Sequence, residues 1–118
     1  MSTALDRAIS ERELTDSIVA EAQLRGWLCH HCRPSQNARG RWQTAITGDP
    51  GMPDLLLVHL IQKRVVVIEC KSERGKVSAE QWAWLDAFEL AGGAEAYVLR
   101  PSDRDRISGI LSGERVLR

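Results

Sequence analysis

Three charged residues at the ends of two apolar segments have the types and the spacing to form a reactive site. Asp54 opens the apolar run 55–60, and Glu69 and Lys71 follow the apolar run 65–68. If the two runs are strands that pair as a hairpin, Asp54 lies near Glu69 and Lys71, which share one face of their strand. Burying charges at the end of an apolar sheet is unfavourable unless they are paired or coordinated. The cluster therefore predicts a functional site.

A divalent-metal site for phosphodiester hydrolysis accounts for this cluster. Oxygen ligands, the carboxylates of Asp54 and Glu69 and the carbonyl of Cys70, suit Mg²⁺ or Mn²⁺. Such an ion acidifies a bound water and polarises a phosphoryl oxygen, and Lys71 can position the water or offset charge developing on phosphorus. The alternative is a structural ion pair at a strand end. The turn at 51–53 and the hairpin-length gap favour the metal site.

The pattern PD…ExK resembles that of the PD-(D/E)xK nuclease superfamily. The fuller strings, GMPDLLL and VVVIECKSERGKVSAEQWAWLDAFELAGG, resemble its VRR-NUC branch over about residues 13–103. By this resemblance, Asp54 and Glu69 are metal ligands and Lys71 is the catalytic lysine. The resemblance also implies that Gln81 is the glutamine that this branch carries on the helix after the core strands.

The superfamily usually adds an acidic residue on its first helix, and by resemblance this residue is Glu13, with Glu21 as the alternative. Ser10 and Glu13 also form a capping-box pattern that opens a helix ending near Gly26. An apolar stripe at fourfold spacing follows, which faces the sheet. Glu13 therefore has two competing roles, one at the helix start and one at the metal.

Length and composition predict a single soluble globular domain. The chain has 118 residues, of which 43% are apolar and 27% are charged. We expect residues 1–9 to be a flexible lead-in and residues 10–118 to form one nuclease domain. Three cysteines and no apolar stretch of membrane or signal-peptide type predict a cytoplasmic protein, and the resemblance to stand-alone phage and bacterial members implies a bacterial or phage-infected cell. A net charge of zero argues against a protein that coats DNA non-specifically.

Residues 27–32 have the pattern of the first strand and contain two cysteines flanking two histidines. A structural zinc site usually needs four converging ligands. Neighbours on a strand point to opposite faces, so Cys29, Cys32 and the histidines between them cannot converge on one ion. Cys70 and His59 form no second spaced pair. We therefore expect Cys29 or Cys32 to pack in the core and one histidine to face the cleft or solvent.

The segment 33–51 is polar, contains glycine and lacks clear periodicity, which is typical of functional or disordered loops. Its arginines and its indole have the chemistry to bind phosphates and to stack on an exposed base. Two more basic residues follow Lys71. The candidate DNA contacts are Arg33, Arg39, Arg41, Trp42, Arg74 and Lys76. Beside a nuclease site we favour DNA contact over the alternative of a solvated mobile loop.

The rest of the chain predicts a helix, a strand and a closing helix. Ser78 and Gln81 form a second capping-box pattern, so Gln81 has a role at the helix start as well. The apolar stripe of this helix comprises Trp82, Leu85 and Leu90, widened by Trp84 and Phe88. The element order predicts an α/β fold with a mixed four-stranded sheet whose last strand, 94–99, is parallel to the core. This agrees with the αβββαβ restriction-endonuclease-like core that the resemblance implies.

Together, the residues and the resemblance predict a Mg²⁺- or Mn²⁺-dependent DNA endonuclease. By resemblance, stand-alone VRR-NUC proteins are small homodimers that cut branched DNA such as four-way (Holliday) junctions. A single small domain offers little surface for reading sequence, so we expect recognition by shape. The alternatives are a nickase or flap-type repair or replication nuclease, and a non-catalytic DNA-binding module. Retention of Asp54, Glu69 and Lys71 argues against the last.

Overall fold

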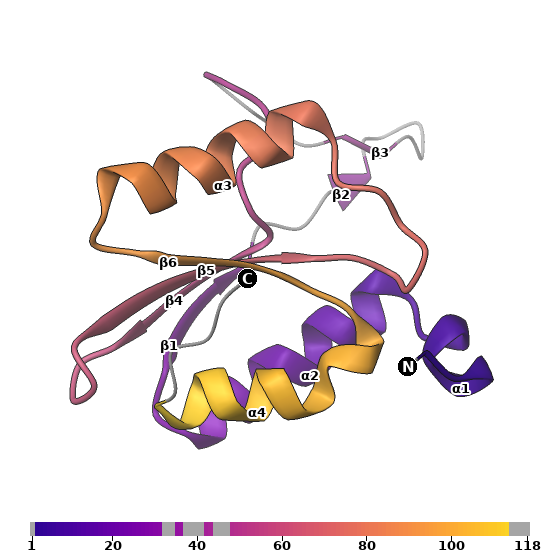
Figure 1. Ribbon diagram of the computed structural model, residues 1–118, viewed down its shortest axis with the longest axis horizontal. Coiled ribbons are helices and arrows are strands. Elements are labelled where there is room, and N and C mark those ends of the chain that lie inside the picture. Colours follow the sequence, from indigo (N-terminus) through magenta and orange to yellow (C-terminus); the bar gives the residue numbers. More distant parts are fainter. Residues whose placement is uncertain (1, 32–34, 37–41, 44–47, 114–118) are drawn as a thin grey trace.

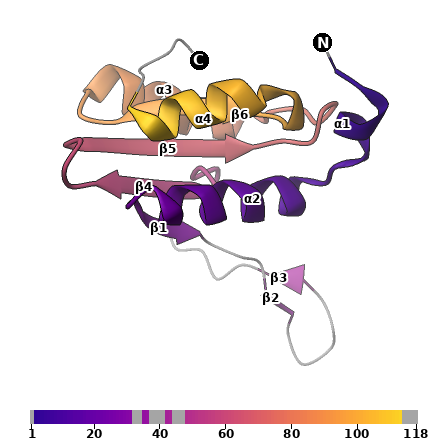
Figure 2. The same cartoon turned by 90° about the horizontal axis from the view of Figure 1, so that it is seen from below.

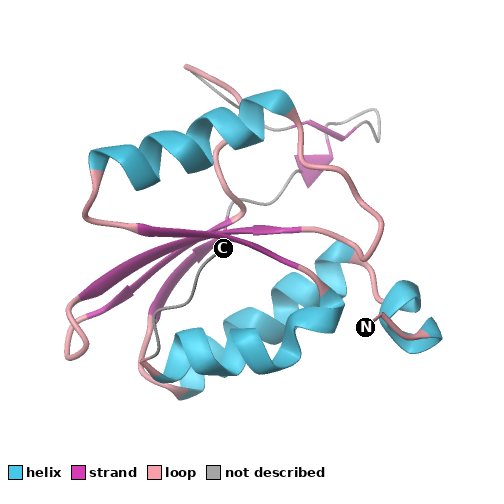
Figure 3. Cartoon of the chain, in the orientation of Figure 1, coloured by secondary structure: helices cyan, strands magenta, loops and turns pink. Residues whose placement is uncertain are grey.

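The computed structural model describes residues 2–31, 35–36, 42–43 and 48–113, with the backbone alone for 35–36 and 42–43. The helices are α1 (Ala4–Ala8), α2 (Glu11–Leu24), α3 (Ala79–Ala91) and α4 (Arg104–Ser112), and the 3-10 helix η1 (Pro101–Asp103) precedes α4. The strands are β1 (Leu28–His31), β2 (Ser35–Gln36), β3 (Trp42–Gln43), β4 (Leu55–His59), β5 (Arg64–Cys70) and β6 (Glu95–Leu99). The αβββαβ core is present, with α1, η1, α4 and the short pair β2–β3 in addition (Figure 3).

The main sheet is mixed, as the sequence predicts, and has the strand order β1-β4-β5-β6. β4 pairs antiparallel with β1 and β5, and β6 runs parallel to β5 after the crossover through α3. The β4–β5 register sets Leu55 opposite Ile68, so the residue before Leu55 reaches the last residues of β5. β2 and β3 form a separate antiparallel ribbon that lies off the main sheet in Figure 2.

Helices cover both faces of the main sheet, with α3 on one face and α2 and α4 on the other (Figure 1). β5 is buried on both faces, because Ile68 and Cys70 pack in the core beneath α2 and α4 while Val67 packs with Leu85 of α3. A strand buried on both sides needs apolar residues without alternation, which explains the β-branched run in its centre. The stripe of α2 predicted from the sequence is fully within this core: Leu14, Ile18 and Ala22.

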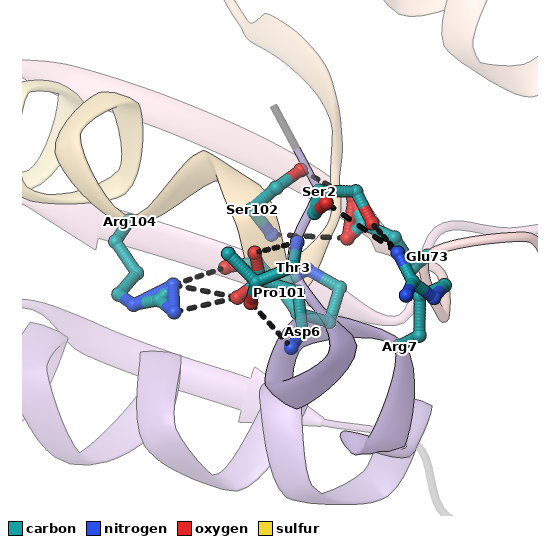
Figure 4. A network of polar contacts seen from close by, with 8 residues as sticks. All are labelled: Ser2, Thr3, Asp6, Arg7, Glu73, Pro101, Ser102 and Arg104. Atoms are coloured by element: carbon teal, nitrogen blue, oxygen red, sulfur yellow. Dashed lines mark hydrogen bonds and ion pairs between the residues drawn. The ribbon is translucent and has the colours of Figure 1, made fainter.

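Residues 1–9, for which the sequence predicts a flexible lead-in, contain the short helix α1. Thr3 caps it, since its hydroxyl accepts a hydrogen bond from Asp6 N–H and its own N–H donates to the Asp6 carboxylate. The other Asp6 oxygen accepts hydrogen bonds from Arg104 of α4 at 2.5 Å and 2.7 Å (Figure 4). The Thr3 N–H lowers the pKa of Asp6, and the charge of Arg104 lowers it further. These contacts attach α1 to the domain.

The apolar stripe of α3 differs from the sequence prediction. Leu85 is fully buried and Phe88 packs against the same small core, but Leu90 is 88% exposed and Trp82 is 41% exposed. Leu90 follows Leu85 by five residues and therefore projects about 140° away around the helix. The buried face of α3 is thus narrower than the run of apolar residues suggests.

A buried arginine joins the first residue of β5 to β6 and to α4. Arg64 is 5% exposed, and its Nε and Nη2 donate to the two carboxylate oxygens of Glu95 at 2.8 Å and 2.7 Å. Its Nη1 donates to the carbonyl of Ile110 at 2.7 Å, and its guanidinium lies 5.3 Å from the ring centroid of Trp27. Hydrogen bonding with Glu95 raises the pKa of Arg64. The buried guanidinium is therefore paired with a carboxylate and hydrogen-bonded to the backbone, which offsets the cost of removing its charge from water.

Candidate metal centre and active site

The β4–β5 hairpin brings Asp54 and Glu69 together at one end of the main sheet. Asp54 precedes β4, and its Oδ2 accepts a hydrogen bond from the backbone N–H of Cys70 at 2.8 Å. This contact fixes the Asp54 carboxylate beside the end of β5, where Glu69 is 1% exposed. The two carboxylates thus face one another because of strand register, with no specialised loop required.

Lys71 and Gln81 both converge on Glu69. Lys71 Nζ lies 3.6 Å from Glu69 Oε2, and the Lys71 backbone N–H continues the sheet by donating to Leu99 O at 3.0 Å. Gln81 Nε2 donates to Glu69 Oε2 at 3.2 Å, while its Oε1 accepts a hydrogen bond from Ser78 N–H at 2.9 Å. A single amide side chain therefore completes the capping box of α3 and also supports the carboxylate.

The acidic residue that α2 contributes to this cluster is Glu11. Carboxylate oxygens of Glu11, Asp54 and Glu69 all lie within 4.8 Å of one another. Glu13 instead accepts a hydrogen bond from Ser10 N–H at 3.2 Å, which is the capping role weighed in the sequence.

Glu21, the other candidate on the same helix, pairs with Arg25 at 2.9 Å. Residues two positions apart on an α-helix point in directions that differ by about 200°, so Glu11 and Glu13 cannot face the same site. One feature of the sequence points to Glu11, although the motif does not identify it. The first turn of α2 has two acidic residues, and Glu11 is the one that the capping box does not use.

The electrostatics of the cluster favour binding of a cation. Burial, followed by the charge and hydrogen bonding of Asp54, raises the pKa of Glu69 to about 8, and the ammonium of Lys71 only partly offsets this. Among the described residues, Glu69 Oε1 is the buried side-chain oxygen for which no hydrogen-bond partner is found. Three carboxylates with an open acceptor form the hard oxygen donor set that Mg²⁺ or Mn²⁺ prefers. The residues therefore fit a divalent cation.

Cys70, between Glu69 and Lys71, points away from this cluster into the core. Burial raises the pKa of its thiol to about 12, so its sulfur stays protonated and does not compete as a ligand. A metal-binding role for its backbone carbonyl stays a prediction.

The turn before Asp54 packs tightly on the start of α3. Gly51 has φ +104°, and a Cβ there would lie 2.6 Å from the backbone C and O of Glu80 and 2.9 Å from Gln81 N. Trp84 of α3 holds the same turn, because its Nε1 donates to the carbonyl of Pro50 at 2.9 Å. The turn therefore fixes the distance between Asp54 and the helix that carries Gln81.

The candidate DNA contacts are only partly within the described chain. Arg74 and Lys76 are exposed in the connection between β5 and α3, directly after Lys71. Trp42 belongs to β3, but its side chain lies outside the described part of the structure. The remaining candidates also lie outside it: Arg33, Arg39 and Arg41.

Comparison with known proteins agrees with this geometry. The family model described as the VRR-NUC domain matches residues 3–103, which is most of the chain. The chain belongs to the VRR-NUC family. This domain is a nuclease of the PD-(D/E)xK type, so the VRR-NUC chain is a hydrolase that acts on DNA. No curated protein and no solved structure matches it significantly. In the described part of the chain, no helix has the length and apolarity to cross a membrane.

Proposed function

We propose that this nuclease is a Mg²⁺- or Mn²⁺-dependent DNA endonuclease whose ion is held by Glu11, Asp54 and Glu69. The observation that carries the proposal is the convergence of these three carboxylates, one of which, Glu69, has a buried oxygen, Oε1, without a hydrogen-bond partner among the described residues. When bound, a divalent cation supplies the positive charge that polarises a phosphodiester and acidifies an attacking water. The backbone carbonyl of Cys70 is a further candidate ligand in the same place.

The other polar residues of the centre act on orientation and charge. Lys71, 3.6 Å from Glu69, holds its ammonium where it can orient a water or offset the charge that develops on phosphorus. Gln81 keeps the Glu69 carboxylate in one orientation through its hydrogen bond from the start of α3. Arg74 and Lys76 extend positive charge from this end of the sheet, and we assign them to contacts with DNA phosphates.

Direct tests of the metal centre use two variants of neighbouring glutamates. Glu11→Gln removes a carboxylate from the cluster, so we expect it to weaken metal binding and cleavage by at least about tenfold. Glu13→Gln makes the same change in charge two residues away and keeps the capping box, since Gln also serves at N3. We expect it to stay within about twofold of the wild type, because it touches only the helix start.

The measurements are metal-dependent cleavage of DNA and the rise of the melting temperature with Mn²⁺. Binding to the folded state alone stabilises a protein by about 2.7 kcal/mol at a hundredfold excess over Kd. An equal loss of cleavage and of Mn²⁺ stabilisation in the Glu11 and Glu13 variants would contradict the assignment of Glu11 as a metal ligand. A wild type that binds DNA but cleaves none with either ion would overturn the metal-dependent reaction and favour a binding module.

For the substrate, we propose branched DNA, such as a four-way junction, cut by a homodimer that places two centres across two strands. The support is the small size of the domain, which leaves little surface for reading base sequence, so that shape is the property most readily recognised. Junction, flap, nicked and linear duplex substrates should be compared in one assay. Preference for flap or nicked DNA would replace the junction by the second candidate, a flap-type nuclease or nickase. Sedimentation of the protein alone and with a junction tests the dimer.

A further inference from the structure

One arginine holds the turn that directly follows Lys71. We call residues 72–75 the lysine turn; it closes with a hydrogen bond from Gly75 N–H to Ser72 O at 3.1 Å. Arg100, the residue after β6, places Nη1 2.8 Å from Ser72 O, 3.3 Å from Glu73 O and 2.7 Å from Gly75 O. Three carbonyl oxygens of one turn therefore converge on a single cationic nitrogen. Charge-assisted hydrogen bonds of this kind are stronger than neutral ones, so Arg100 fixes the shape of the turn.

Residues 72–75 also lie beside the Lys71 side chain and limit its exposure. A Cβ at Gly75 would lie 3.5 Å from Lys71 Cδ and 2.9 Å from Ser72 Oγ, so the turn backbone at Gly75 lies close to the aliphatic part of the lysine. Lys71 is only 8% exposed although it is a lysine beyond the end of a strand. Its freedom to move away from Glu69 is therefore limited by the turn that Arg100 holds.

The segment that carries Arg100 is itself anchored at several points. The Arg100 N–H donates to Asp103 Oδ2 at 2.8 Å. Glu73 of the lysine turn accepts hydrogen bonds from both the N–H and the hydroxyl of Ser102, as Figure 4 shows. These contacts make residues 100–103 a rigid support, and they join it to the lysine turn independently of the Arg100 side chain.

We propose that Arg100 is a positioning residue for Lys71: by binding the three carbonyls of the lysine turn, it keeps the Lys71 ammonium directed at Glu69. The proposal rests on the proposed function only where it concerns catalysis, since the shielding of Lys71 can be measured without any cleavage of DNA. Arg100 lies outside the strings that carry the family resemblance at the catalytic residues, and its guanidinium is not a member of the carboxylate cluster. It acts on the reaction through Lys71.

The test compares Arg100→Ala with Arg106→Ala. Arg106 lies in α4, and its Nη1 bonds Asp103 at 3.3 Å, so its removal changes the charge of the same region without touching the carbonyls of the lysine turn. The first readout is acetylation of lysines by a water-soluble succinimidyl acetate, followed by peptide mass spectrometry. In Arg100→Ala we expect Lys71 to react at least about tenfold faster than in the wild type, because the turn no longer shields it. Lys63, which is exposed on the β4–β5 hairpin, is the internal reference and should not change.

The second readout is steady-state cleavage of DNA. Displacing a catalytic group by about 1 Å can cost roughly a hundredfold in rate, so we expect kcat to fall by about 10- to 100-fold in Arg100→Ala. KM should change by less than about threefold, since Arg100 makes its contacts to the protein. Arg106→Ala should resemble the wild type in both constants. Arg100→Lys keeps a cation on a shorter, non-planar head, and should show the same changes with smaller amplitude.

The outcomes separate the positioning role from the proposed reaction. The proposal is overturned if folded Arg100→Ala matches Arg106→Ala in both Lys71 acetylation and kcat. If the wild type cleaves no DNA at all, the proposed function fails, while the acetylation rates still decide whether Arg100 positions Lys71. If Arg100→Ala does not fold, the same two readouts on Arg100→Lys decide it.

Discussion

Replacing Gly51 by alanine should damage this protein more than the same change at Gly48, although both glycines have φ near +100° (+104° and +102°). An L-residue in this region of φ costs about 1–3 kcal/mol, a cost that the two variants share. The added Cβ at Gly51 would also lie 2.6 Å from backbone atoms of Glu80, and backbone cannot rotate away as a side chain can. At Gly48, no described atom lies within 4 Å of the new Cβ. Relief of the overlap at Gly51 should cost about a further 1–3 kcal/mol.

Thermal unfolding measures this difference directly. At about 4 °C per kcal/mol for a chain of this size, Gly51→Ala should melt about 4–12 °C below Gly48→Ala. Activity should separate them as well, because the shift moves Gln81 relative to Glu69 and lengthens a hydrogen bond that is already 3.2 Å. Equal melting temperatures and equal cleavage rates in the two variants would refute the argument that the turn fixes the spacing between Asp54 and α3.

Three further predictions concern stability. The pKa of Glu69 is raised from 4.5 to about 8 in the folded, metal-free protein. The contribution of Glu69 to the free energy of unfolding is therefore fully present below pH 4.5, and up to about 5 kcal/mol of it is lost as pH rises to 8. Melting curves in EDTA across this range check it, and Glu69→Gln should flatten the profile. Arg64→Ala removes the arginine from the half-buried Glu95, to which the hydroxyl of Tyr97 still donates, and should cost about 3–5 kcal/mol by urea unfolding, whereas the double variant with Glu95→Gln should recover part of the loss. Leu85→Ala should lower the free energy of unfolding by about 2–5 kcal/mol, because Leu85 is buried. Leu90→Ala, at an exposed position of the same helix, should lower it by less than about 0.5 kcal/mol. A similar loss of stability in both variants would contradict the observed buried face of α3.

The proximity of Asp54 and Glu69 is predictable from sequence because it depends on a single hairpin. Two apolar runs and a short polar corner define the pairing, and the register then follows from which residues are apolar. The capping boxes at Ser10 and Ser78 are equally local, and the helices begin where these patterns place them. The mixed sheet follows from the element order, since a helix between two strands returns the second strand parallel to the first.

Other features depend on contacts that no local pattern records. The choice between Glu11 and Glu13 is a rotation about the helix axis relative to a strand some 60 residues away, and a motif that specifies only an acid on the first helix cannot resolve it. The three carbonyls held by Arg100 belong to residues 25–28 positions earlier in the chain. The helix α1 owes its place to an ion pair that spans 98 residues. The sequence shows which chemical groups such residues carry, but it does not show which distant residues they contact.

The parallel pairing of β5 with β6 determines when during synthesis this enzyme can become active. Lys71 N–H bonds Leu99 O, so the segment bearing the lysine is completed only by a strand translated almost thirty residues later. A chain still lacking β6 and Arg100 has Asp54, Glu69 and Lys71 in its sequence but lacks the contacts that order the last of them. Domains fold as units once their last core element has left the ribosome. We therefore expect the nascent polypeptide to gain hydrolytic competence only after β6 and Arg100 have been made and have packed beside β5.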